Sequence, residues 1–169
     1  MAGQLVQVAT NTVTSAVSSV TLTGIDSDDV YMVAINNFTP STDSVSVRVR
    51  FTVSGSADTS SNYDRAYKNL KANTSGSSTS STNASELLAG NIGTGTSESY
   101  NAIYYLFNFN NSSEYSFITL ETSVRQQDGH LQASQGGAVL TVAQATDGII
   151  FQASSGNIAS GTFTLYKVV

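Results

Sequence analysis

The clearest pattern in the sequence is a strict alternation of apolar and polar residues over residues 44–55, SVSVRVRFTVSG. Alternate valines and Phe51 fall on one side of this segment, while serines, arginines and Thr52 fall on the other. A period of two is the spacing of a β-strand that buries one of its faces. The pattern therefore predicts a half-buried strand with Arg48 and Arg50 together on its polar face.

Short apolar runs recur along the rest of the chain and are separated by turn residues. The segments 101–110 and 114–125 predict a hairpin. Asp128-Gly129 predicts a tight turn, because glycine readily adopts the positive φ that such turns need. Turns about every ten residues indicate an all-β fold, and we expect an antiparallel β-sandwich or jelly-roll in one domain, residues 1–169. Further strands are expected at 5–9, 16–24, 30–38, 137–145, 148–154 and in the closing GTFTLYKVV, where Phe163 and Leu165 share a face.

One segment departs from the alternation. In SSNYDRAYKNLKA (60–72) the apolar side chains recur at i, i+3, i+4 and i+7, the spacing of one helical face, namely Tyr63, Ala66, Tyr67 and Leu70. This spacing predicts one short helix near residues 61–71. The stretch that follows, about 73–85, is rich in Ser, Thr and Asn and has no apolar anchor. We expect a flexible loop there.

Composition and charge narrow the classes of function. The chain of 169 residues has a net charge of −5, and its 7 Lys and Arg residues do not cluster. Nucleic-acid binding normally needs a basic patch, so we expect no nucleic-acid partner. No apolar run reaches the ~20 residues of a membrane helix, and the N-terminal residues do not resemble a signal peptide. We expect a soluble protein that begins at Met1, without disulfides or thiolate metal sites, because there is no cysteine.

Candidate catalytic and metal-binding residues are few. His130 is the only histidine and would have to be the base of any Ser-His-Asp triad, but no G-x-S-x-G motif accompanies it, which favours an exposed turn histidine. The carboxylates of Asp26-Ser27-Asp28-Asp29 are of the type that binds Ca²⁺. Their spacing is not that of an EF-hand, which favours a solvated turn. No local setting marks a glutamate as the acid of a glycoside hydrolase, whether Glu86, Glu98, Glu114 or Glu121. We therefore expect no enzyme, no catalytic residue, no metal and no cofactor.

Tyrosines and arginines are the candidates for partner contact. Tyr104 and Tyr105 point to opposite faces of one predicted strand, so at most one belongs to the core. Other tyrosines flank loops, where they either form a sugar- or protein-binding surface or, as we favour, lie at the sandwich ends with their hydroxyls in water. Arg48 and Arg50 are candidates to bind acidic groups of a partner, although arginines on a polar strand face are usually solvated. The 73–85 segment is a further candidate for contact with a partner. The loop-flanking tyrosines are Tyr63, Tyr67, Tyr100 and Tyr115. Asn-x-Ser/Thr sequons, expected by chance in such a sequence, include those that begin at Asn37, Asn73, Asn83 and Asn111.

Three stretches resemble a module of tailed bacteriophages, especially marine and cyanobacterial ones. They are NNFTPSTDSVSVRVRFTVSGS (36–56), SSNYDRAY (60–67) and SSGNIASGTFTLY (154–166). The module occurs as small standalone virion proteins and at the C-termini of tail or fibre proteins. Its usual Gly-Ile after the tyrosine is replaced here by Lys167-Val168-Val169. These motifs are structural, and the resemblance supplies no functional residues.

The resemblance implies a structural protein on the virion surface, assembled in the cytoplasm of the host bacterium. The expected function is that of a capsid decoration (cement) protein, a homotrimer that binds the major capsid protein or other virion proteins and stabilises the head shell by mass action. The alternative is a tail-fibre or receptor-binding tip that recognises a host-surface glycan or protein, although the chain has no heptads or shaft repeats. A non-viral carbohydrate-binding module is disfavoured because there is no Trp.

Overall fold

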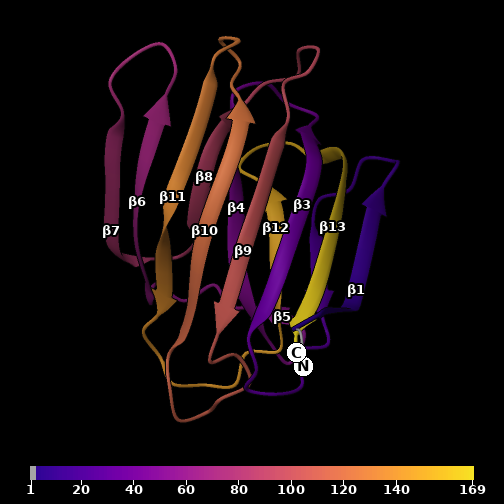
Figure 1. Ribbon diagram of the computed structural model, residues 1–169, viewed down its shortest axis with the longest axis vertical. Helices are drawn as coiled ribbons and strands as arrows, with labels where there is room; N and C mark the ends of the chain where they lie inside the picture. Colours follow the sequence, from indigo (N-terminus) through magenta and orange to yellow (C-terminus); the bar gives the residue numbers. More distant parts are fainter. Residues whose placement is uncertain (1–2) are drawn as a thin grey trace.

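Two antiparallel β-sheets pack face to face in the computed structural model, which describes residues 3–169 except for the side chains of Leu88 and Ala89 (Figure 1). One sheet has the strand order β1-β13-β3-β9-β10-β11-β6-β7, and the other has the order β2-β12-β4-β5, with β8 also paired to β4. This arrangement confirms the predicted antiparallel β-sandwich. Residues 1 and 2, which the predicted domain includes, lie outside the described residues. The strands are β1 (Leu5–Val13), β2 (Val20–Thr23), β3 (Tyr31–Pro40), β4 (Val45–Val53), β5 (Ser56–Ala57), β6 (Tyr63–Lys71), β7 (Ser77–Ala84), β8 (Leu87–Ile92), β9 (Tyr100–Phe107), β10 (Ser116–Arg125), β11 (Leu131–Leu140), β12 (Gly148–Ala153) and β13 (Ile158–Val168).

The strands form where the sequence alternates. In β4 Val45, Val47, Val49 and Phe51 are buried while Arg48 and Arg50 lie on the opposite face, as predicted. At the end of the strand the pattern differs, because Thr52 is buried and Val53 is half-buried. The 101–110 and 114–125 segments form the predicted hairpin of β9 and β10. Gly129 has a φ of 79° in the predicted turn between β10 and β11, and the C-terminal strand β13 lies inside its sheet, hydrogen-bonded to both β1 and β3.

A single hydrophobic core fills the space between the sheets. Its centre is a chain of aromatic contacts in which Phe163 of β13 lies 5.6 Å from Phe151 of β12 and 6.1 Å from Phe38 of β3, measured between ring centroids. These rings come from both sheets, so their packing fixes one sheet against the other. The largest fully buried side chains are Tyr31, Tyr63, Tyr100, Tyr104, Phe38, Phe51, Phe109, Phe151, Phe163, Leu22, Ile92 and Leu106.

The predicted helix near residues 61–71 is wrong, because this segment is strand β6. Tyr63 points into the core, whereas Ala66 and Leu70 are exposed on the outer face of the sheet. A close backbone approach favours the strand: β6 lies so near β11 that a Cβ on Gly136 would be 2.3 Å from the Ala66 carbonyl oxygen. The glycine therefore allows a pairing of β6 with β11 that any larger residue would obstruct.

The predicted flexible loop over about 73–85 is also wrong for most of its length. Residues Ser77–Ala84 form β7, which pairs with β6 and makes one edge of the eight-stranded sheet. An edge strand needs only one hydrogen-bonded neighbour and can leave both faces in water, so it does not require apolar anchors. Across residues 3–169 the structure contains no helix of the length and apolarity that a membrane crossing requires.

Candidate functional site

His130 follows the Asp128-Gly129 turn, and its side chain is 49% exposed, as predicted for a turn histidine. Its Nδ1 lies 3.4 Å from Oδ1 of Asp128. The backbone N–H of His130 donates to that carboxylate and holds the pKa of Asp128 below its usual value. Within residues 3–169 no serine or threonine hydroxyl is hydrogen-bonded to the imidazole, so the geometry of an activated nucleophile is not assembled here.

The carboxylates of the Asp26–Asp29 turn point to different partners rather than to one centre. Asp26 accepts from the Tyr31 hydroxyl at 3.1 Å, and Asp28 accepts from the Asn111 side-chain amide at 2.8 Å. Asp29 forms an ion pair of 2.6 Å with Lys167. Within residues 3–169 no three His, Cys, Asp or Glu side chains gather to hold a metal ion.

The Asp29–Lys167 pair predicts a specific dependence of stability on pH. A hydrogen bond from Lys167, and to a smaller extent one from Ser27, lowers the pKa of Asp29 in the folded protein. The ionised Asp29 therefore stabilises the fold above the pKa of an aspartate in the unfolded chain, about 3.9, and this stabilisation is lost as the pH falls through the lower pKa of the folded protein. We expect Asp29→Asn to be less stable than the wild type at pH 7, with a difference that shrinks below about pH 4. Urea unfolding at pH 7 and in acid measures this; an equal difference at both pH values would contradict it.

The arginines of β4 bind an acidic group of their own chain. Oε2 of Glu86 lies 2.6 Å from Nη2 of Arg50, and Oε1 lies 3.0 Å from Nε of Arg48, an ion pair by distance that lacks hydrogen-bond geometry. Ser85 and Glu86 connect β7 to β8, so the ion pair of Glu86 with Arg50 fastens the crossing from one sheet to the other. Both arginines therefore face an acidic group of their own chain. Arg50 is not a solvated side chain, whereas Arg48 remains partly in water, and contact of either arginine with a partner stays a prediction.

The other glutamates make separate contacts. Glu98 accepts from the Gly95 backbone N–H, Glu114 from Asn108 and Glu121 from Gln135. Each contact is an exposed hydrogen bond to a neighbouring backbone or amide group. These contacts do not form the two facing carboxyl groups that glycoside hydrolysis uses.

Two of the loop-flanking tyrosines belong to the core, not to the wet ends of the sandwich. Tyr63 is fully buried; its hydroxyl accepts from the Phe51 N–H at 3.1 Å and donates to the Asp58 carbonyl. Tyr100 is also buried, and its hydroxyl shares a hydrogen bond with that of Tyr104. Burial raises the pKa of all three tyrosines well above the ordinary value. Tyr105 points the other way and is 41% exposed, so only one of the Tyr104-Tyr105 pair is in the core, as predicted.

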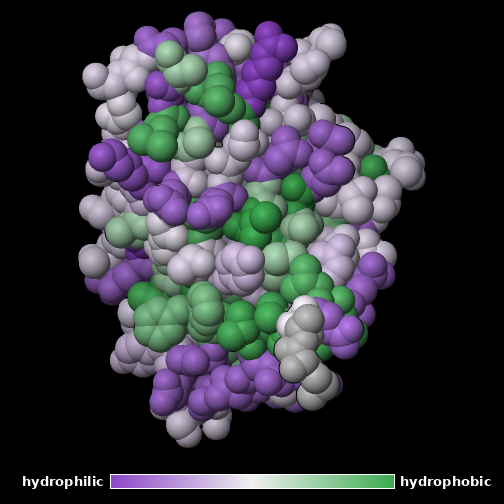
Figure 2. Space-filling view, in the orientation of Figure 1, coloured by the Kyte–Doolittle hydropathy of each residue, from purple (hydrophilic) through white to green (hydrophobic). Residues whose placement is uncertain are grey.

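The surface with the most distinctive chemistry is the outer face of the eight-stranded sheet. Figure 2 looks onto this face and shows hydrophobic side chains gathered in a band across its lower part. The same face has a hollow of about 300 Å³ beside the chain termini, here called the terminal hollow. Leu5, Met32, Tyr105 and Val168 line it with Gly3 and Gln4. Leu5 is 49% exposed, so the hollow offers large apolar groups to a partner.

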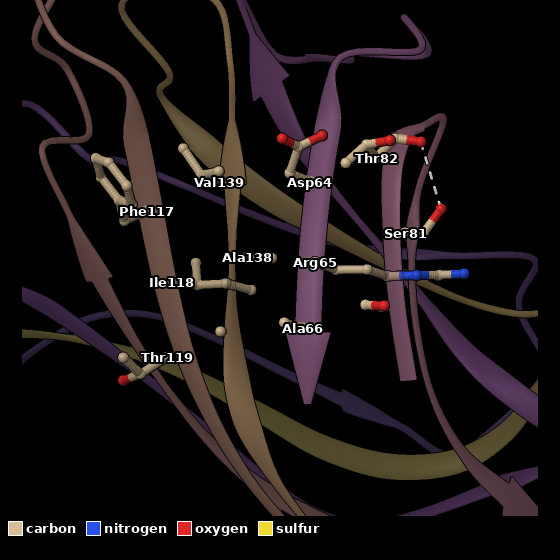
Figure 3. A pocket seen from close by; sticks show the side chains of 12 residues that line it. Asp64, Arg65, Ala66, Ser81, Thr82, Phe117, Ile118, Thr119, Ala138 and Val139 are labelled. Carbon is tan, nitrogen blue, oxygen red and sulfur yellow. Dashed lines mark hydrogen bonds between the residues drawn. The ribbon is translucent and has the colours of Figure 1, made fainter. Parts of the chain in front are cut away.

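The other half of the same face contains a wider depression of about 830 Å³, here called the transverse groove. Its floor is a row of small cross-strand neighbours, Thr119, Gly137, Ala66 and Ser80, from β10, β11, β6 and β7. Phe117, Val139 and Asp64 stand side by side along one wall (Figure 3). The groove exists because this row is small here, whereas its continuation on β9 and β3 is Tyr105 and Met32.

Sequence reasoning did not find either depression. Each row joins residues that are far apart in the chain, such as Ala66 and Gly137, and the row appears only when the strand order and register are known. The one available signal was the Gly136-Gly137 pair within an apolar run, since glycine inside a strand marks a close approach or a bare surface. No protein-family model, curated protein or solved structure matches the chain.

Proposed function

We propose that the protein is a structural component of the virion surface of a tailed bacteriophage and that it binds the head shell as a capsid decoration protein. The observation that supports this is the terminal hollow, in which Leu5 and Tyr105 are exposed although they are large and uncharged. Exposed apolar side chains gathered in one place are typical of a surface that another protein covers. The sequence resemblance to phage surface modules is the basis for expecting the major capsid protein or another virion protein as that partner.

The free edge of β1 borders the terminal hollow and supports the same proposal. β1 pairs with β13 on one side only, and its nine residues, LVQVATNTV, contain no charge and no proline. Proteins usually protect such an edge with lysine, proline or a covering segment, because its unpaired N–H and C=O groups invite another chain. The register of β1 shifts between Gln7 and Ala9, but the strand has neither a charge nor a proline to block pairing. Such an edge beside an apolar hollow fits a permanent contact with a neighbouring virion protein.

The copy number of the protein in purified virions tests the proposal. We expect a number comparable to that of the major capsid protein, measured by quantitative mass spectrometry. A number that matches the few tail fibres would favour the alternative, a receptor-binding tip, and absence from virions would overturn both. A homotrimer is the expected assembly, and light scattering on the purified protein measures the mass that tests it.

A variant of the terminal hollow tests the docking surface itself. Tyr105→Glu places a charge in the hollow without touching the core, and we expect it to reduce the copies per virion strongly. Tyr115→Glu is the matched control, because Tyr115 is similarly exposed but lies outside the hollow. Equal copy numbers for the two variants would show that the hollow does not bind the shell.

A further inference from the structure

We infer that the transverse groove is a binding site for a neutral oligosaccharide. The inference does not depend on the proposed location on the head or the tail, because the groove lies across β10, β11, β6 and β7, whereas the terminal hollow is lined by β1, β3, β9 and β13. The two depressions meet where Tyr105 of the hollow lies opposite Thr119 of the groove floor. Its four strands span three inter-strand spacings, about 14 Å at ~4.8 Å each. This length suits a short chain of sugar rings lying across the strands.

The walls of the groove combine an aromatic face with hydrogen-bonding groups. Phe117 is 42% exposed at one end and offers a ring on which the C–H face of a sugar can stack. Asp64 stands on the same wall, and its Oδ1 accepts the backbone N–H of Asn83 at 3.0 Å. In the described part of the chain its second oxygen has no hydrogen-bond donor, so it is available to a ligand hydroxyl. Hydroxyl groups of Thr119 and of β7 line the floor and the far end.

The backbone around the groove disfavours a peptide ligand. The strands β10, β11 and β6 pair with neighbours on both sides, so their N–H and C=O groups are used within the sheet. A peptide crossing these three strands would bring backbone groups that need partners and would find only side chains. The free backbone edge at the groove is that of β7, and a peptide paired there would run along the strand, not across the floor. A sugar matches the site better, because each hydroxyl both donates and accepts and the ring carries its own apolar face.

The charges near the groove disfavour an acidic ligand. Asp64 stands on one wall, while Glu121 and Gln135 are hydrogen-bonded neighbours in the row that borders the opposite side. Lys68 follows Gln135 in that row and is the cation nearest to it in register. Arg65 also lines the groove, but its guanidinium donates to the Glu86 carbonyl oxygen. Two carboxylates therefore balance the two cations, and the groove has no excess positive charge for sulfated or sialylated chains, which leaves neutral sugars as the class that fits.

Screening the purified protein on an array of neutral and acidic oligosaccharides, followed by titration calorimetry with the best neutral ligand, tests the inference. We expect binding to neutral chains, a loss of at least about tenfold in affinity for Phe117→Ala, and no measurable binding for Ala66→Leu, which fills the floor. Tyr115→Ala and Thr12→Leu are the matched controls, since both are exposed positions outside the groove.

The outcomes separate this inference from the proposed function. Circular dichroism and thermal melting first establish that each variant is folded. Failure to bind any neutral oligosaccharide, preference for acidic ones, or unchanged affinity in folded Ala66→Leu would each overturn the glycan site. None of these results alters the copy number in virions, which tests the structural role alone.

Discussion

Replacing Phe163 with alanine is expected to destabilise the protein by about 3–5 kcal/mol, the usual cost of removing a fully buried aromatic ring. Phe163 has no exposed surface, and its ring contacts Phe38 of the same sheet and Phe151 of the opposite sheet. Its loss leaves a cavity between the sheets, because the strands on either side of β13 are held by their hydrogen bonds and cannot collapse into the space. Urea unfolding followed by circular dichroism measures the free energy of unfolding.

Two further variants keep this prediction testable even if the alanine variant does not fold. Phe163→Leu retains most of the volume and is expected to cost about 1 kcal/mol. Thr162→Ala, on the next residue of the same strand but on the outer face, is expected to change stability by less than about 0.5 kcal/mol. A leucine variant no less stable than the threonine control would show that the ring is not central to the core.

The fold class was predictable because burial in a two-layer sandwich follows the period of two. β10 is the best example: buried and exposed residues alternate along all ten positions, as its sequence suggests. The turn at Asp128-Gly129 was predictable for a local reason as well, since glycine tolerates the φ of 79° found there. Both features depend on residues that are neighbours in the sequence.

The error at β6 has a simple geometric origin. Tyr63 and Tyr67 are four residues apart, and a spacing of four places two side chains on the same face of a helix and also of a strand. The helical interpretation depended on Ala66 and Leu70, and both point outward in the strand. The deciding factor was the partner strand β11, whose Gly136 lies more than 60 residues away and permits the close pairing.

The candidate site was beyond sequence reasoning for the same reason. The transverse groove and the terminal hollow are built from one cross-strand row that is large at Met32 and Tyr105 and small at Gly137 and Ala66. The sequence of a single strand does not reveal this change in side-chain size along the row, because each strand contributes only one residue to it. The role of Glu86 was hidden similarly, since its arginine partners on β4 come from an earlier part of the chain.

Removing the Glu86 side chain is expected to destabilise the fold by about 2 kcal/mol. The carboxylate is only 15% exposed, and Glu86→Ala would leave Arg50, 17% exposed, without its anionic partner. Breaking a fully buried ion pair costs more than this, and a fully exposed one costs little, so a partly covered pair lies between the two. The free energy of unfolding in urea measures the loss, and Glu121→Ala is the control, because Glu121 is an exposed glutamate on the outer face.

A double-mutant cycle separates the two arginines. Arg50 also donates to the Ser85 carbonyl oxygen and to Gln152, which holds its guanidinium in place for Glu86. Arg48 is 38% exposed and lacks hydrogen-bond geometry to the carboxylate. We therefore expect a larger coupling energy between Glu86 and Arg50 than between Glu86 and Arg48, and a coupling to Arg48 that weakens more as salt is added. Equal couplings would contradict the expected difference between the two arginines. A Glu86→Ala variant as stable as the Glu121→Ala control would mean that the ion pair does not fasten the crossing between the sheets, and that the hydrophobic core alone keeps them together.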